Sequence, residues 1–474
     1  MRARRRASGG AAAILAAVAD APLAVVLAAG RGTRMRSRTP KALHPLAGRP
    51  LLLHVVAAAA AATGTEPLVV VSPEHPEVAA ALDGVASTAE QAQARGTGDA
   101  LRSVPEARRS AGPVLVLSGD TPLLRPDTFA ALLGRQHETA AACVVLGVVP
   151  ADPHGLGRLV RDAAGGVVRI VEERDLPPGE AAPAECNAGA YAFDGARLWP
   201  VLERLGSDNA QGELYLTDVV ELLGGAEAVV AADPDEALGV NDRCQLATAE
   251  GVLRRRTLDA LMLAGVTVED PATTYVDPEV RVGRDSVLLP MTVLRGATTL
   301  GEGCVVGPMA QLRDVRGGDR VRIGASSLEE CELGDDVVIG QYDRLRPGTH
   351  LGAGVYVGTH AELKNSHVGP GTRISHFSCV LDSDVGSDVN VGAGTVTCNY
   401  DGEAKHRTVI GDGAFIGTDA SLVAPVRIGA GAYIAAGSVI TRDVPDGALA
   451  VERARQTVVE RWAERRRRPR EDAS

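Results

Sequence analysis

The 474-residue sequence predicts an α/β domain with a covered parallel sheet, followed by a three-sided solenoid of short β-strands. Two observations support this prediction. Up to about Leu238, apolar strand-like runs alternate with Ala/Leu-rich stretches, which is the pattern of repeated βαβ units. After about Ala272, an aliphatic residue followed by a small residue recurs with a period of six, and such a repeat indicates a solenoid.

In the first half, the glycine-rich segment Leu27-Ala-Ala-Gly-Arg-Gly-Thr-Arg-Met35 directly follows the first predicted strand. Glycines at a strand-to-helix turn let backbone N–H groups approach phosphate oxygens, and Arg34 and Lys41 add positive charge. Such a turn alone is weak evidence, but the continuation Thr39-Pro-Lys41 strengthens the prediction of a phosphate site. The predicted strands are 24–29, 68–72, 113–118 and 143–149, and the predicted helices are 50–62, 97–104 and 126–135.

Between the halves, residues 241–264 place Leu, Ala and Arg at helical spacing and contain no proline, so we predict a connecting helix. In the second half, Ile410 and Ile428 lie three repeats apart, as a three-sided coil requires. Breaks in the period near 312–320 and 397–408 predict loops that leave the coil.

Composition excludes several classes of protein. A formal net charge of −11 argues against a nucleic-acid surface, which needs clustered positive charge. The seven cysteines include no Cys-x-x-Cys pair, so neither a disulfide framework nor a zinc site is expected, and a reducing compartment fits best.

The two ends of the sequence are expected to be tails. The Arg-rich start and the following Ala-rich run resemble a signal peptide, but Asp20 interrupts the run and the first strand begins soon afterwards. We therefore predict an extension rather than a signal. The basic run 465–468 is typical of a solvated tail and predicts no partner.

Further motifs follow in order along the first half: Gln91-Ala-Gln-Ala-Arg-Gly96-Thr97, Leu117-Ser-Gly-Asp120, Gly155-Leu-Gly157-Arg158, Val171-Glu172, Glu185-Cys-Asn187 and Gly239-Val-Asn241. Together with the solenoid, they resemble the family of bifunctional N-acetylglucosamine-1-phosphate uridylyltransferases and glucosamine-1-phosphate N-acetyltransferases, from about Val25 to Arg453. The resemblance implies an α/β Rossmann-like nucleotidyltransferase domain followed by a left-handed parallel β-helix of hexapeptide repeats, assembled as a homotrimer.

The expected organisation is a disordered extension (1–20), a nucleotidylyltransferase domain (21–241), a linker helix (242–266), a left-handed β-helix acetyltransferase domain (267–453) and a C-terminal tail (454–474). The resemblance implies a cytoplasmic enzyme that acetylates glucosamine-1-phosphate with acetyl-CoA. It would then transfer UMP from UTP to N-acetylglucosamine-1-phosphate, making the activated amino sugar of bacterial cell-wall polymers. No membrane and no nucleic acid are expected as partners.

For uridylyl transfer, the resemblance implies Arg34 and Lys41 as catalytic residues and Mg²⁺ bound by Asp120 and Asn241. Hard cations prefer oxygen ligands and keep several waters, so one carboxylate and one amide beside nucleotide phosphates suffice. The residues implied to bind the UDP-sugar are Leu27, Ala28, Ala29, Gly30, Lys41, Gln91, Gly96, Thr97, Ser118, Gly119, Asp120, Gly157, Glu172, Asn187 and Asn241.

For acetyl transfer, the resemblance implies His376 as the general base, a role that suits a side chain titrating near neutrality. Arg346, Lys364 and Asn390 would bind glucosamine-1-phosphate. The residues implied to contact acetyl-CoA, at sites completed by neighbouring subunits, are Ala393, Asn399, Tyr400, Thr418, Ala436 and Arg453.

One departure concerns this second site. The family has a tyrosine three residues after the catalytic histidine, whereas this sequence has Cys379. A phenolic hydroxyl that would hold the sugar phosphate is therefore missing, and we expect weaker binding of glucosamine-1-phosphate.

Two alternatives remain open at this stage. The chain could be a single-function sugar-phosphate nucleotidylyltransferase whose β-helix only trimerises it, although His376, Lys364 and Asn399 argue against this. It could also be a scaffold without activity, which should have lost Lys41, Asp120 or Asn241, yet it retains all three.

Overall fold

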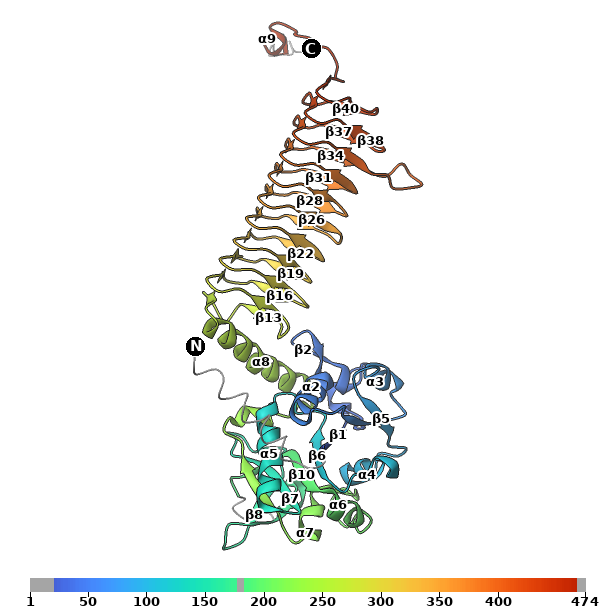
Figure 1. Cartoon of the computed structure of the whole chain (residues 1–474), viewed down its shortest axis with the longest axis vertical. Coiled ribbons are helices and arrows are strands. Elements are labelled where there is room, and N and C mark those ends of the chain that lie inside the picture. The colour runs from blue at the N-terminus through green and yellow to red at the C-terminus, as the bar shows by residue number, and fades with distance from the viewer. Residues whose placement is uncertain (1–20, 177–182, 467–474) are drawn as a thin grey trace, which may run out of the picture. The chain divides into compact units, whose positions relative to one another are not determined.

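The computed structural model describes residues 21–176 and 183–466, so the predicted extension 1–20 and the end of the predicted tail lie outside the described residues. The chain forms two compact units that divide between Arg255 and Arg256 (Figure 1). This division falls inside helix α8 (Arg243–Leu263), at the position of the predicted connecting helix.

The first unit is built on a mixed sheet with the strand order β11-β7-β10-β6-β1-β4-β5. Strands β1, β4, β5 and β6 are parallel, whereas β10 runs antiparallel to both β6 and β7. The strands are β1 (Leu23–Leu27), β4 (Leu68–Val71), β5 (Ser87–Glu90), β6 (Pro113–Ser118), β7 (Cys143–Val148), β8 (Arg158–Arg161), β9 (Val167–Val171), β10 (Cys186–Asp194) and β11 (Glu227–Val230), with a small hairpin of β2 (Pro45–Leu46) and β3 (Arg49–Pro50).

Helices cover both faces of this sheet, because successive strand residues point to opposite sides. On one side, Val26 packs in a core with Leu52 and Val55 of α2, and on the other Val25 packs in a core with Leu101 of α4. The helices are α2 (Leu51–Thr63), α3 (Pro76–Ala80), α4 (Thr97–Arg102), α5 (Pro126–Thr139), α6 (Gly195–Leu202) and α7 (Asp218–Leu222).

The predicted strands and helices of this unit are confirmed to within a few residues. The predicted parallel sheet is confirmed for β1, β4, β5 and β6, but the prediction was wrong for β10, which runs antiparallel. Its segment is rich in Ala and Gly, with an irregularity between Asn187 and Tyr191, so it lacks the continuous β-branched run that marked the other strands.

The second unit is a left-handed parallel β-helix in which every third strand along the chain is paired, so each coil contributes one strand to each of three sheets. The first sheet contains β12 (Thr267–Val268), β15 (Val287–Leu288), β18 (Val305–Val306), β21 (Arg322–Ile323), β24 (Val338–Ile339), β27 (Tyr356–Val357), β30 (Arg373–Ile374), β33 (Asn390–Val391), β36 (Phe415–Ile416), β39 (Tyr433–Ile434) and β41 (Leu449–Ala450).

The second sheet contains β13 (Tyr275–Val276), β16 (Val293–Arg295), β19 (Gln311–Arg313), β22 (Ser327–Glu329), β25 (Arg344–Leu345), β28 (Glu362–Lys364), β31 (Cys379–Leu381), β34 (Val396–Cys398), β37 (Ser421–Val423) and β40 (Val439–Ile440). The third contains β14 (Arg281–Val282), β17 (Thr299–Leu300), β20 (Arg316–Gly317), β23 (Cys331–Leu333), β26 (Thr349–Leu351), β29 (His367–Val368), β32 (Ser383–Val385), β35 (Thr408–Ile410) and β38 (Val426–Ile428). A short helix, α9 (Trp462–Arg466), follows them.

Inward-pointing aliphatic side chains stack from coil to coil and form the core of the β-helix. In the second sheet, Leu312, Leu328, Leu345 and Leu363 are paired in register and are almost completely buried. The end of α8 contributes Leu258 to the same core. One coil cannot bury its own apolar residues, so each depends on its neighbours.

The two predicted loops have different outcomes. Residues 399–407 leave the coil between β34 and β35, as predicted, and form the extension beside β34 in Figure 1. Near 312–320 the prediction was wrong, because β19 and β20 continue the coil there and Gly317 takes the inward register position between Leu300 and Leu333. Within the described residues, no helix is both long and apolar enough to cross a lipid bilayer.

One buried carboxyl interrupts a column of small residues in the β-helix. The residue before each strand of the second sheet is buried, and apart from Asp343 these residues are Thr274, Thr292, Ala310, Ser326, Ala361, Ser378, Thr395, Ala420 and Ser438. Asp343 Oδ1 accepts a hydrogen bond from the Ala361 amide at 2.7 Å, but among the described residues Oδ2 is buried without a partner. Burial raises the pKa of the Asp343 carboxyl to about 6.

We therefore predict that Asp343→Ser stabilises the protein above pH 6. The carboxyl binds a proton more tightly in the folded chain, so the stability of the parent falls as pH rises from about 4 to about 6. The gain at pH 8 should be about 3 kcal/mol, the free energy that corresponds to a carboxyl pKa raised from about 4 to about 6. Melting temperatures between pH 4 and 8 would measure it. Asp343→Asn should stabilise the protein in the same way. Plots of melting temperature against pH that run parallel for the variants and the parent would contradict the argument.

Candidate functional site

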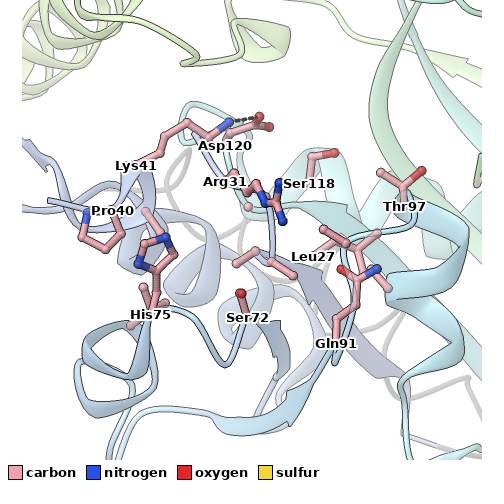
Figure 2. A pocket seen from close by; sticks show the side chains of 18 of the residues that line it. Leu27, Arg31, Pro40, Lys41, Ser72, His75, Gln91, Thr97, Ser118 and Asp120 are labelled. Atoms are coloured by element: carbon pink, nitrogen blue, oxygen red, sulfur yellow. Dashed lines mark hydrogen bonds and ion pairs between the residues drawn. The ribbon is translucent and has the colours of Figure 1, made fainter. Parts of the chain in front are cut away.

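A cavity of about 380 Å³ opens at the carboxyl edge of the parallel strands in the first unit (Figure 2). Strands β1 and β6 end at its wall, and the segment that follows β5 closes one side. Ligands of open α/β sheets bind at this edge. The predicted residues that line the cavity are Leu27, Ala28, Ala29, Gly30, Lys41, Gln91, Gly96, Thr97, Ser118, Gly119 and Asp120.

The glycine-rich turn holds Lys41 in position. Gly32 has a positive φ of 57°, and a Cβ there would lie 2.6 Å from the Cβ of Lys41, so only glycine allows this close approach. Arg34 is exposed, and it is not among the described residues that form the wall of this cavity. Arg31 lines it instead and forms an ion pair with Glu74 at 3.4 Å.

The Lys41 ammonium lies between the two residues predicted to bind a metal. Its Nζ is 2.6 Å from Asp120 Oδ2 and 3.1 Å from Asn241 Oδ1. The ammonium marks a position where two hard oxygen donors already stabilise one positive charge. Because Mg²⁺ prefers such donors and keeps water in its remaining positions, this pair fits the metal.

The amide of Gln91 and the start of α4 are tied to a second segment of the chain. Gln91 Nε2 donates to the Gly96 carbonyl at 3.1 Å and to Asp99 Oδ2 at 2.9 Å. Thr97 Oγ1 accepts from the backbone amide of Leu216 at 3.0 Å. These contacts fix one wall of the cavity. Asp99 lies behind this wall, and the sequence motifs did not single it out.

The three residues predicted to bind the sugar lie next to one another but outside the lining of this cavity. The backbone N–H of Asn187 donates to the Gly157 carbonyl at 2.9 Å, and a Cβ on Gly157 would lie 3.5 Å from Glu172 Oε2. Burial raises the pKa of the Glu172 carboxyl, although a hydrogen bond from Thr217 partly opposes this. The group therefore offers an amide and a poorly solvated carboxyl to a hydroxylated ligand.

In the β-helix, four of the predicted residues form a single column along one edge, and the side chain of a fifth, Arg453, reaches the end of it. Three carbonyls accept a backbone hydrogen bond from the next coil: Gly394 N to His376 O, Asp419 N to Ala393 O and Gly437 N to Thr418 O. The carbonyl of Ala436 accepts from Arg453 Nη1 at 3.0 Å. Neighbouring coils lie about 4.8 Å apart. The three steps from His376 to Ala436 thus span about 14 Å, and the Arg453 guanidinium lies beyond the last of them. This line suits an extended ligand such as the pantetheine chain of acetyl-CoA.

The predicted sugar-phosphate residues are divided between two faces of the β-helix. Lys364 belongs to the second sheet, and Arg346 directly follows β25 of that sheet, with its Nη1 3.0 Å from Glu362 Oε1. Asn390 lies in the first sheet, paired with Arg373 and Phe415. His376 sits at the corner between these sheets, beside Phe377 with ring centroids 5.4 Å apart.

The loop after β34 is anchored by one carboxylate. Asp382 accepts hydrogen bonds from the Asn365 amide at 2.7 Å and from the Asn399 amide. Burial alone would raise the pKa of Asp382, but these two hydrogen bonds and the charges of Lys364 and Lys405 lower it. The anchor holds the base of the loop, while Tyr400 remains 60% exposed.

Two ammonium groups meet next to this anchor. A contact with the Lys405 side chain and its positive charge lower the pKa of Lys364. Lys405 was not among the residues predicted from the sequence, because nothing local distinguishes it from other surface lysines in a loop. Two cations held together favour an anion between them, so this pair is suited to a phosphate.

Cys379 occupies the position of the tyrosine expected from the resemblance. It points outward from β31, in register with Glu362 and Val396, and is partly buried. Burial raises the pKa of its thiol. The side chain is therefore a neutral, short group beside charged neighbours.

Comparisons with known proteins agree with this architecture. A family model described as MobA-like NTP transferase domain matches residues 24–215. A second, described as bacterial transferase hexapeptide (six repeats), matches residues 407–442.

Full-length relatives are also similar. A protein of Thermobifida fusca named bifunctional protein GlmU is 48% identical over 462 residues, covering 95% of this chain and 96% of that protein. Proteins with the same name from Heliobacterium modesticaldum and Streptomyces avermitilis are each 46% identical. The first match covers 94% of this chain and 98% of the relative, and the second covers 94% of both.

From the lysine pair we predict that Lys405→Met weakens the binding of inorganic phosphate or a sugar phosphate to the β-helix. Loss of one charge-assisted contact should cost about tenfold in affinity, and the remaining affinity should depend less on salt. Calorimetric titration at two salt concentrations would measure both effects. Arg427→Met, on the third sheet, is the control, and equal affinities of Lys405→Met and the parent would contradict the assignment.

Proposed function

Because the chain belongs to the family of bifunctional GlmU proteins, we infer that it is an enzyme of UDP-N-acetylglucosamine biosynthesis with two active sites. It acetylates glucosamine-1-phosphate with acetyl-CoA and then transfers UMP from UTP to N-acetylglucosamine-1-phosphate, releasing pyrophosphate. The observation that carries this conclusion is that one chain holds both the Lys41–Asp120–Asn241 cluster and the column from His376 to Arg453.

In the acetyl transfer, His376 takes a proton from the amine of glucosamine-1-phosphate as that nitrogen attacks the thioester carbonyl. Acetyl-CoA lies along the column, so that its thioester is near His376 and its far end is near Arg453. Lys364, Arg346 and the nearby Lys405 hold the sugar phosphate. Positioning of two reactants in this way supplies much of the rate acceleration.

In the uridylyl transfer, the phosphate oxygen of the sugar attacks the α-phosphorus of UTP in line, and pyrophosphate leaves. Lys41 stabilises negative charge on the phosphates, and Gln91 with the start of α4 holds the uracil. Mg²⁺ bound by Asp120 and Asn241 would neutralise charge on the phosphate oxygens. Arg34 acts on the phosphates only after its exposed side chain turns toward the cavity.

The acetyltransferase site is completed by a neighbouring subunit in a homotrimer. Support comes from the division of Lys364 and Asn390 between two faces of one β-helix, with His376 at the corner between them. A second copy packed along this corner supplies the groups that one chain turns away. The enzyme works in the cytoplasm, where UTP and acetyl-CoA are made, and its seven cysteines are free thiols.

The proposed domain limits follow from the assignment of one reaction to each half of the chain. Residues 21–241 form the uridylyltransferase, 242–266 the linker helix and 267–453 the acetyltransferase. The alternative of a β-helix that only trimerises the protein is not favoured, because the full-length relatives are bifunctional by name.

The first test separates the two reactions with single substitutions. His376→Ala should lower release of the CoA thiol by about 10² to 10⁴-fold, the usual contribution of a general base, and leave pyrophosphate release from UTP and N-acetylglucosamine-1-phosphate unchanged. Asp120→Ala should do the reverse. Thiol and pyrophosphate are followed separately on the same preparations. Pyrophosphate release without thiol release in the parent would reduce the function to uridylyl transfer.

The second test concerns Cys379. Cys379→Tyr should tighten glucosamine-1-phosphate binding by about tenfold, the effect of one added hydrogen bond to a charged group. Cys379→Phe adds the ring without the hydroxyl and should show no such gain. An unchanged apparent affinity in Cys379→Tyr would remove Cys379 as the cause of weak sugar-phosphate binding.

A further inference from the structure

The amide of Gln91 offers only one of its two polar atoms to the cavity. Gln91 directly follows β5, is 5% exposed and belongs to the cavity wall. Its nitrogen donates to the Gly96 carbonyl and to the Asp99 carboxylate, at 3.1 and 2.9 Å. A primary amide has two N–H donors, so both are used and the oxygen remains for a ligand.

The two partners also determine which way the amide is turned. If the group were rotated by 180°, its oxygen would face a carbonyl oxygen and a carboxylate oxygen, and no hydrogen bond could form with either. In Figure 2 the oxygen of Gln91 lies on the side of Leu27 and Ser72, and the nitrogen is turned away from them. The bond to Asp99 is the stronger of the two because its acceptor is ionised.

Asp99 itself is held in place but stays outside the cavity lining. Its side chain is 13% exposed, and its second oxygen lies 3.8 Å from the guanidinium of Arg95. The start of α4 is fixed by the bond from Gly98 N to Leu214 O at 2.8 Å and by that from Leu216 N to Thr97 Oγ1. Asp99 therefore acts on a ligand through Gln91.

An oxygen-only glutamine distinguishes pyrimidines by the atom at ring position 3. Uracil carries an N–H donor there, flanked by two carbonyl oxygens, whereas cytosine carries a lone pair. Gln91 Oε1 can accept a hydrogen bond from the uracil N–H. With cytosine, the same oxygen would face the lone pair of the ring nitrogen, and no hydrogen bond could form. A site that hydrogen-bonds a substrate N–H strongly rejects an analogue that lacks it, because the buried partner is then unpaired.

We propose that Asp99 is a positioning residue that sets the pyrimidine preference of this cavity, by holding Gln91 in the orientation that accepts from the imide N–H of uracil. This inference rests on the proposed uridylyl transfer and deepens it. Asp99 touches neither the base nor the phosphates. Its effect is on the ratio of UTP to CTP use rather than on the chemical step.

Three variants separate this role from a general structural one. Asp99→Ala removes the charged acceptor and lets the amide turn part of the time. Asp99→Asn keeps an oxygen that can accept from Gln91 Nε2, with the Gly96 carbonyl still selecting the same orientation. Arg95→Ala breaks only the ion pair with Asp99 and is the matched control.

The experiment measures kcat/KM for pyrophosphate release with UTP and with CTP, at saturating N-acetylglucosamine-1-phosphate and Mg²⁺. Asp99→Ala should lower the UTP/CTP ratio by about tenfold or more, the effect of losing one hydrogen bond to a charged group. Asp99→Asn should stay within about threefold of the parent and Arg95→Ala should match it, since both keep the acceptor for Gln91.

Direct titration of UTP and CTP into the same variants gives the ratio of Kd values without turnover. If the parent turns over UTP and Asp99→Ala keeps the parent's ratio, or loses both nucleotides equally, the role of Asp99 is overturned while the proposed function stands. If the parent releases no pyrophosphate from UTP, the proposed function fails. The ratio of the Kd values for UTP and CTP then tests the role of Asp99 without turnover. A ratio that Asp99→Ala leaves unchanged overturns the inference.

Discussion

Parallel strand pairing is the constraint on which both sites of this protein depend. In the first unit, β1, β4, β5 and β6 run in the same direction, so the segments that follow them leave from one edge and meet in one cavity. In the β-helix, the same pairing repeats coil after coil, so residues one full coil apart stand in a straight column. For this reason His376 and Ala436 share an edge although many residues separate them, and the Arg453 side chain reaches the same edge.

The two units position their functional groups in different ways. In the α/β unit, side chains hold side chains: Lys41 has two oxygen partners and Gln91 has two acceptors. In the β-helix, backbone hydrogen bonds between coils place the column, and side chains are added to a framework that is already rigid. Asp382 combines the two: it directly follows a strand of the β-helix, and it holds the loop after β34 through hydrogen bonds from two side-chain amides.

An acidic protein that acts on anions must concentrate its positive charge locally. The net charge is −11, yet Lys41 stands at the cavity and Lys364 meets Lys405 beside the β-helix. Each lysine site also contains an aspartate, Asp120 in one case and Asp382 in the other. A carboxylate that pairs with the cation before the substrate arrives keeps the charge in position, so little reorganisation is needed when phosphate binds.

The sequence by itself determined the two architectures and most of the cavity, because periodicity and glycine-rich turns are local features. The hexapeptide repeat predicted the three-sided coil, and the glycine-rich segment after the first strand predicted a turn whose first residues, Leu27 to Arg31, line the cavity. Only the tertiary structure decided the antiparallel direction of β10 and the position of Arg34 outside the cavity wall. It also decided that Lys364 lies close to Lys405 and that Gln91 donates a hydrogen bond to Asp99. These depend on where one segment lies against another and on which rotamer a side chain adopts. Neither is encoded in a short stretch of residues, because both follow from packing energies summed over distant parts of the chain.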